Sequence, residues 1–122
     1  MSKKLLLVVD DEENIRLLYK EELKEEGYDV LLAENGYDAI DLVKKNKIDL
    51  VILDIKMPKI DGIETLRLLK GEKRDLPVVL CSAYGEYKQD FCTWASDAYI
   101  VKTADLSELK AVVKNILNKD DK

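Results

Sequence analysis

The chain of 122 residues contains no histidine and only two cysteines. Without an imidazole it has no histidine-ligated zinc site, no histidine acid–base catalysis and no histidine that donates a phosphoryl group. The two thiols, Cys81 and Cys92, do not have a metal-binding spacing, and we interpret them as reduced packing residues rather than a disulfide. Any metal ion bound by this chain is therefore expected to have oxygen ligands.

Long apolar runs and basic stripes are also missing. The five apolar residues 5–9 are followed at once by acids, and this run is too short for the central region of a signal peptide or for a transmembrane helix. We therefore expect a cytoplasmic protein without membrane insertion. The net charge of −5 comes from 20 basic and 25 acidic residues spread along the chain, so we expect no direct binding of nucleic acid.

The composition is typical of a folded, soluble domain. Hydrophobic residues make up 47% of the chain and charged residues 37%, and the length suffices for one core. We expect a single domain over residues 1–122, with a short polar tail at 118–122 that frays.

Short apolar runs alternate with segments of helical spacing. The runs predict strands over 5–9, 28–33, 49–53, 77–82 and 98–101. The spacings predict helices over 15–27, around 39–43, over 63–71, over 86–95 and over 106–117. Such alternation implies an α/β fold, a doubly wound five-stranded parallel sheet with helices on both faces.

Two local predictions concern the first two helices. Ile15, Leu18 and Leu23 are expected to share the buried face of the first helix. Asn35 and Gly36 are expected to open a turn before the second.

The stretch 51–62 combines a buried strand with turn residues. Its apolar run leads into Asp54, and Pro58 and Asp61 then precede the helical spacing that starts after Gly62. The sequence predicts a strand, an exposed acid, a loop and a helix. Taken alone, Asp54 is either a turn-capping residue or a placed reactive group.

Polar residues follow four of the predicted strands. Because parallel strands end at one edge of the sheet, we expect these residues to converge there: Asp10 with Asp11, Asp54, Ser82 and Lys102. The acids after the first strand would repel a phosphate but attract a hard cation, and Mg²⁺ fits best. With that ion, Asp54 can act as a carboxylate nucleophile toward phosphorus, while Lys102 and Ser82 bind phosphoryl oxygens.

Each of these residues also has a purely structural interpretation. Asp10 and Asp11 can serve as a helix N-cap, Ser82 as a loop hydroxyl and Lys102 as a solvated charge. Their joint placement after four strands favours the chemical interpretation.

Four motifs together resemble a bacterial two-component response-regulator receiver domain over the whole chain. They are VVDD at 8–11, LDIKMPKIDG at 53–62, SAYGE at 82–86 and AYIVK at 98–102. Lys56, residues 83–86 and the length of one domain make the chain more similar to single-domain phosphorelay regulators than to the chemotaxis member of the family. The resemblance implies a flavodoxin-like (βα)5 fold with strand order 2-1-3-4-5.

The resemblance also implies a role for each site residue. The phosphoacceptor falls on Asp54, the phosphate-binding lysine on Lys102, and the switch pair on Ser82 and Tyr99. The implied Mg²⁺ ligands are Asp10, Asp11, Asp54 and the backbone carbonyl of Lys56. The implied function is a signal-relay switch that takes a phosphoryl group from a histidine kinase or histidine phosphotransfer protein and then acts on a downstream protein. It would be no enzyme beyond its own phosphorylation and dephosphorylation.

The chain also departs from the family pattern. Thr103 replaces the usual proline after the lysine, and Trp94 replaces a frequent glycine. Lys56 and Tyr84 are expected to shield the phosphoryl group from water and slow its hydrolysis. Two alternatives remain: an interaction module that no longer switches, and a metal-dependent phosphatase, which would usually have a second acid where this chain has Lys56.

Overall fold

The computed structural model describes residues 3–55, 62–82, 98–101 and 106–120. Within them, the elements follow in the order β1 (Leu5–Val9), α1 (Glu13–Glu25), β2 (Asp29–Ala33), α2 (Gly36–Lys45), β3 (Leu50–Asp54), α3 (Gly62–Glu72), β4 (Val78–Ser82), β5 (Ala98–Val101) and α5 (Ser107–Asp120). The helix predicted over 86–95 lies outside the described residues.

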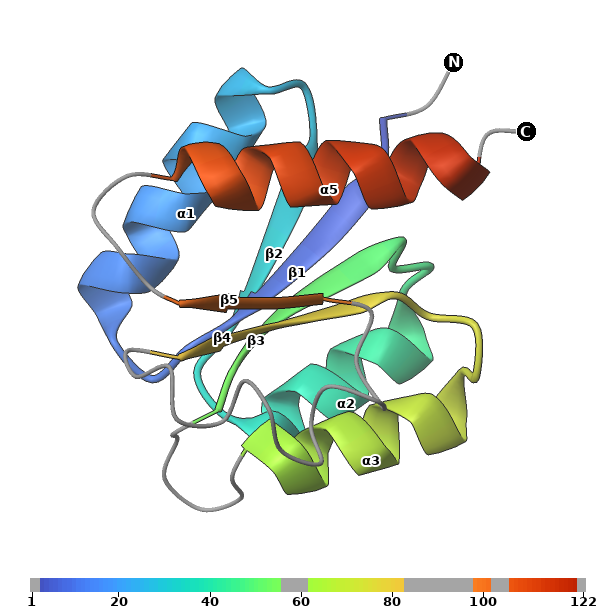
Figure 1. The fold of residues 1–122 in the computed structure, drawn as a ribbon. Helices are drawn as coiled ribbons and strands as arrows, with labels where there is room; N and C mark the ends of the chain where they lie inside the picture. The colour runs from blue at the N-terminus through green and yellow to red at the C-terminus, as the bar shows by residue number, and fades with distance from the viewer. Residues whose placement is uncertain (1–2, 56–61, 83–97, 102–105, 121–122) are drawn as a thin grey trace.

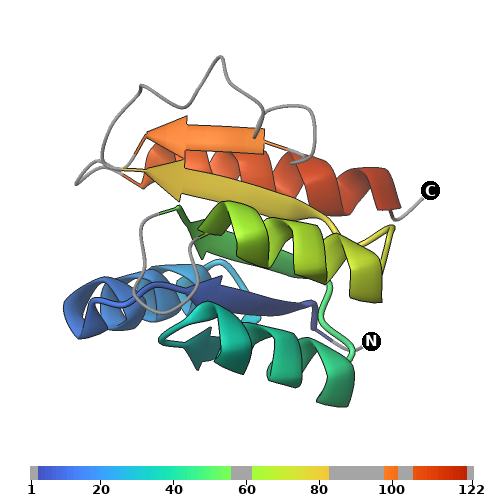
Figure 2. The same ribbon diagram turned by 90° about the horizontal axis from the view of Figure 1, so that it is seen from below.

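The described strands form one parallel sheet in the order β2-β1-β3-β4-β5. Helices α1 and α5 cover one face of this sheet, and α2 and α3 cover the other (Figures 1 and 2). This arrangement confirms the predicted doubly wound α/β fold and its strand order. The middle position belongs to β3, whose five residues are all buried.

Each face of the sheet has its own hydrophobic core, because successive side chains of a strand point to opposite faces. Leu7 and Val9 of β1 pack with residues of α2 and α3, among them Val43 and Leu66. The intervening strand residues pack with α1 and α5, in a cluster that includes Leu6, Val8, Tyr19, Leu23, Leu109 and Val113.

The inward face of α1 differs from the predicted one. Tyr19 and Leu23 are buried, whereas Leu18 is 40% exposed and Leu17 is 52% exposed. Residues four apart lie on the same face of a helix, so Tyr19 and Leu23 together set the buried stripe and turn Leu18 to its flank.

Several element ends also differ from the sequence prediction. Helix α5 continues into the predicted tail as far as Asp120, whereas α3 ends at Glu72, near Gly71 as predicted. The expected turn at Asn35 is the N-cap of α2, where its side chain accepts a hydrogen bond from the Asp38 N–H at 3.0 Å. A side chain that accepts a hydrogen bond from a backbone N–H stabilises the start of a helix. Asn35 therefore begins a helix where the residue types alone suggest a turn.

Candidate functional site

Asp10 lies directly after β1, at the carboxyl edge of the sheet. It is 2% exposed, and its backbone N–H donates to the Ala33 carbonyl at 3.1 Å. Its Oδ1 accepts a hydrogen bond from the Glu12 N–H at 2.9 Å, and its carbonyl oxygen accepts one from Arg16 at 2.8 Å. These bonds hold the start of α1 against the end of β1. The helix-capping interpretation is thus correct in part, although the N-cap position belongs to Glu12.

Three acids at this edge lie close enough to share one cation. The carboxylate oxygens of Asp10, Asp11 and Glu12 lie within 4.8 Å of one another, with Asp10 buried and the other two exposed. Glu12 was not predicted as a ligand, although the run of acids at 10–13 was the signal for it. An all-oxygen set with solvent on one side fits Mg²⁺, which keeps several waters and accepts a few carboxylates.

Asp54 ends the middle strand of the sheet. Leu53 pairs with Val9, so Asp54 and Asp10 follow paired residues of neighbouring strands, and Asp54 itself pairs with Cys81 of β4. The prediction of an exposed acid is wrong, because Asp54 is only 6% exposed. Its strand has a neighbour on each side and helices on both faces, and these surround a side chain at its last position.

The pKa of the buried Tyr19 phenol depends on the charges at this edge. Burial raises the pKa of Tyr19 above its ordinary value, and the thiol of Cys81 and the carboxylates of Asp10 and Asp54 raise it further. Both acids therefore act electrostatically on one side chain of α1. That shared effect agrees with their placement at the ends of adjacent strands.

Ser82 ends β4 and is 1% exposed. It pairs with Val101 of β5, and its strand lies beside that of Asp54. Ser82 is thus a strand residue, and the interpretation as a loop hydroxyl is wrong. The described part of the chain brings Asp10, Asp11, Asp54 and Ser82 to the same edge, as predicted.

Of the remaining predicted site residues, Tyr99 alone belongs to a described strand. Tyr99 is in β5, where its backbone pairs with Leu80. The others fall outside the described residues: Lys56, Tyr84, Trp94, Lys102 and Thr103.

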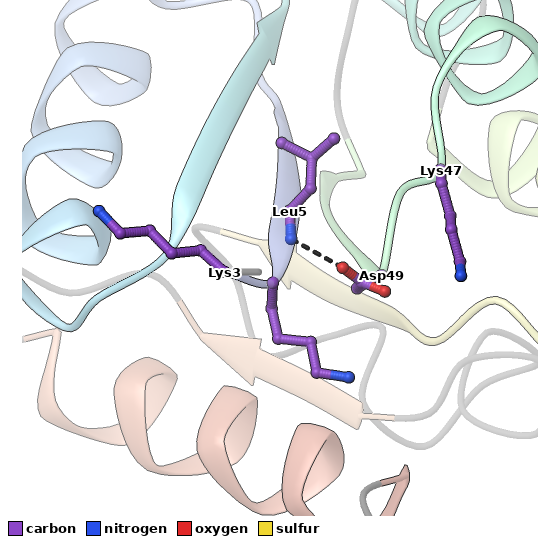
Figure 3. Close-up of a pocket in the computed structure, with 5 residues that line it drawn as sticks. Lys3, Leu5, Lys47 and Asp49 are labelled. Atoms are coloured by element: carbon purple, nitrogen blue, oxygen red, sulfur yellow. Dashed lines mark hydrogen bonds between the residues drawn. The ribbon is translucent and has the colours of Figure 1, made fainter. Parts of the chain in front are cut away.

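A pocket of about 310 Å³ opens at the other end of the sheet, where β1 begins (Figure 3). Lys3, Lys4 and Lys47 line it together with Leu5 and Asp49. The Asp49 carboxylate accepts a hydrogen bond from the Leu5 N–H at 2.8 Å, which ties the start of β1 to the segment before β3. Its lysine-rich lining does not suit a cation, so the candidate site is the acidic edge.

None of the described helices is long and apolar enough to cross a membrane.

Known proteins with similar sequences are bacterial regulators and related proteins. The model of the response regulator receiver domain matches residues 6–114. Sporulation initiation phosphotransferase F of Bacillus subtilis is 37% identical over 119 residues, which cover 96% of each chain. The alkaline phosphatase synthesis transcriptional regulatory protein PhoP of the same organism is 37% identical over 123 residues. That match covers 99% of this chain but 51% of PhoP, so the chain spans about half the length of that relative.

Solved structures with the same fold include the response regulator protein TrrA of Thermotoga maritima in complex with Mg²⁺ and BeF. It matches with a TM-score of 0.88 and 48% identity, covering 92% of this chain and 97% of TrrA. TrrA in complex with the histidine kinase ThkA matches equally well, with a TM-score of 0.88 over 93% of this chain and 98% of TrrA. Family model, relatives and fold agree, and the chain belongs to the response regulator receiver domain family.

Proposed function

We propose that this receiver domain is a phospho-accepting relay that takes a phosphoryl group onto Asp54 in a Mg²⁺-dependent reaction. The observation that carries the proposal is the position of Asp54, buried at the end of β3 between Asp10 on one side and Ser82 on the other. The donor would be a histidine kinase or a histidine phosphotransfer protein. We propose no enzymatic activity beyond the domain's own phosphorylation and dephosphorylation.

The chemistry follows from the residue types at the edge. A carboxylate oxygen of Asp54 attacks the phosphorus atom, the bond between phosphorus and the donor's histidine nitrogen breaks, and that nitrogen keeps the electron pair. Asp10, Asp11 and Asp54 are the expected ligands among the described residues that would hold Mg²⁺, and Glu12 lies close enough to Asp10 and Asp11 to join them. The ion would neutralise charge on the phosphoryl oxygens. The Ser82 hydroxyl donates a hydrogen bond to one phosphoryl oxygen, and Lys102 neutralises another.

The donor protein needs a docking surface close to Asp54. Helix α1 begins at the acidic edge, and Leu17 and Leu18 are the exposed large apolar residues on it. Leu17 and Leu18 are adjacent in the chain and lie on the helix that starts at the site, and contiguous exposed apolar side chains can mark a contact with a partner protein. We propose that the histidine-bearing partner contacts α1 through this pair. Two relatives support a kinase partner, since TrrA was solved in complex with ThkA and phosphotransferase F is named for phosphotransfer.

The function is tested by intact-mass measurement after incubation with acetyl phosphate and Mg²⁺. The wild-type chain should gain the mass of one phosphoryl group, and chelation of Mg²⁺ should abolish the gain. Asp54→Asn keeps the side-chain size but removes the nucleophile, so it should gain nothing. Asp75→Asn is the matched control, because Asp75 is an exposed acid in the turn before β4 and should react like the wild type. An unchanged gain in Asp54→Asn would move the acceptor elsewhere.

A further inference from the structure

We propose that Gly62 is a positioning residue for the Asp54 carboxylate, because its missing side chain lets α3 begin directly against the peptide group between Asp54 and Ile55. This inference rests on the proposed role of Asp54 as phosphoacceptor. Its structural part can be tested independently of that role.

The space beside Gly62 is filled by backbone atoms. A Cβ atom at this position would lie 2.3 Å from the carbonyl oxygen of Asp54 and 2.5 Å from the Cα of Ile55. Neither neighbour can rotate away as a flexible side chain could. An ordinary contact begins at about 3.4 Å, so the start of α3 and the end of β3 would have to separate by about 1 Å.

Hydrogen bonds through both of its backbone polar groups fix Ile55, the residue after Asp54. The Gly62 N–H donates to the Ile55 carbonyl at 2.7 Å, and the Ile55 N–H donates to the Cys81 carbonyl at 3.0 Å. Ile55 is therefore held between the start of α3 and β4, immediately after Asp54. A shift of α3 would be transmitted through this residue to the last residue of β3.

Two of the other described glycines, Gly27 and Gly71, serve different purposes. Gly27 has a φ of +97°, in the region that glycine adopts with least strain, and it ends the turn after α1. Around Gly71, in the last turn of α3, no heavy atom of the described residues lies within 4 Å of an added Cβ. Gly62 thus differs from Gly27 and Gly71, because at Gly62 a side chain is excluded by neighbouring backbone atoms.

The chemical consequence concerns the approach of Asp54 to phosphorus. In-line attack requires the oxygen and the phosphorus at a defined distance and angle, and a displacement of about 1 Å can slow a reaction roughly 100-fold. Mg²⁺ binding should fall much less than the rate, because Asp10, Asp11 and Glu12 follow β1, and only Asp54 and the Lys56 carbonyl among the expected ligands adjoin Ile55. A loss of rate much larger than the loss of metal affinity separates positioning from a general loss of structure.

The test compares Gly62→Ala with Gly71→Ala, two identical changes in one helix. We expect Gly62→Ala to slow the mass gain from acetyl phosphate about 100-fold per folded molecule and to weaken binding of Mg²⁺ with beryllofluoride, while calorimetry shows a much smaller loss in binding of Mg²⁺ alone. Gly71→Ala should react like the wild type, and it should stabilise α3 because alanine favours helix more than glycine does. A folded Gly62→Ala protein that reacts and binds beryllofluoride at wild-type levels would overturn the proposal.

Two further measurements cover the remaining outcomes. If Gly62→Ala does not fold, it is introduced together with Gly71→Ala, and failure of this stabilised protein to fold would count against a role limited to positioning. Amide hydrogen exchange gives the activity-independent readout: exchange of the Ile55 N–H should be faster in Gly62→Ala, whereas exchange of the Val51 N–H, bonded to the Pro77 carbonyl at 2.9 Å, should not change. A wild-type chain that gains no mass would refute the proposed function, and the exchange rates would still decide the structural claim.

Discussion

The Nζ of Lys110 lies 2.6 Å from the Oε1 of Glu22, which joins two helices whose residues are 88 positions apart in the chain. Figure 1 shows these helices, α5 and α1, on the same face of the sheet. The side chains are 26% and 33% exposed, so the pair is shielded from water more than the pairs Lys44–Glu72, Lys45–Asp41 and Arg67–Glu64.

The first prediction is that this pair couples α1 to α5 in a salt-dependent way. A double-mutant cycle with Glu22→Gln and Lys110→Met should give a favourable coupling at low ionic strength that fades toward 1 M salt, where the screening length is about 3 Å. The hydrogen bond to Glu22 raises the pKa of Lys110, so the coupling should persist below the ordinary lysine pKa and disappear as the pH rises through the folded-state value. The exposed pair of Lys45 and Asp41 is the control and should couple less.

The raised pKa of Tyr19 predicts that the folded state loses stability at alkaline pH. Its pKa is raised in the folded state from the ordinary value of 10.0, so above about pH 10 the unfolded chain loses this proton first and the folded state is progressively destabilised. A group that ionises only in the unfolded state lowers the free energy of unfolding by about 1.4 kcal/mol per pH unit. Tyr19→Phe should remove this part of the slope in urea denaturation above pH 10. Tyr37 is 59% exposed, and Tyr37→Phe should leave this part of the slope in place.

The N-cap of α2 predicts a measurable loss of stability. The Asn35 side chain accepts from the Asp38 N–H at 3.0 Å, and Asn35 is 4% exposed. Asn35→Ala should lower the free energy of unfolding by about 1 kcal/mol, since the N–H loses its partner. Asn35→Ser keeps an acceptor oxygen and should recover most of the loss. Equal urea midpoints for the wild type and Asn35→Ala would contradict the capping role.

If Leu18 contacts the partner, its substitution should slow phosphoryl transfer from a histidine kinase but not labelling by acetyl phosphate. Leu18→Lys places a charge in the proposed docking surface, so transfer from a histidine kinase should fall at least 10-fold, the effect of about 1.4 kcal/mol. Labelling by acetyl phosphate needs no docking and should not change. Tyr37→Lys makes the same change at an exposed residue of α2, on the opposite face of the sheet, and serves as the control. A parallel fall with both donors would place the defect at Asp54.

The lifetime of the phosphorylated form stays a prediction from the sequence. Lys56→Asn combined with Tyr84→Ala should clearly shorten the lifetime of the aspartyl phosphate, because both side chains are expected to hinder water. Decay of the mass signal after removal of the donor measures it. Equal decay rates for the wild type and the double variant would contradict the shielding.

The strands could be predicted because their apolar runs match their burial. Every residue of β3 and β4 is buried, and such runs are typical of strands covered on both faces. Which face of α1 is buried could not be predicted, because its apolar residues are compatible with two neighbouring faces of the helix. Packing against the sheet buries the face that carries Tyr19 and Leu23.

Which residues form the site could be predicted from the sequence, but their burial and close backbone contacts could not. The positions of Asp10, Asp54 and Ser82 follow from where their strands end, and parallel pairing brings those ends together. The burial of Asp54 depends on neighbours from distant parts of the chain. The steric need for Gly62 depends on how closely α3 approaches β3, which no local pattern encodes.

The strand order also has a consequence for the chain as it leaves the ribosome. Residues up to Asp54 include β1, β2 and β3, so Asp10, Asp11 and Asp54 are all synthesised before β4. One side of β3 pairs with β4, which begins only at Val78. Until translation reaches that point, this side of β3 has no strand to pair with, and an unpaired apolar strand edge can template aggregation.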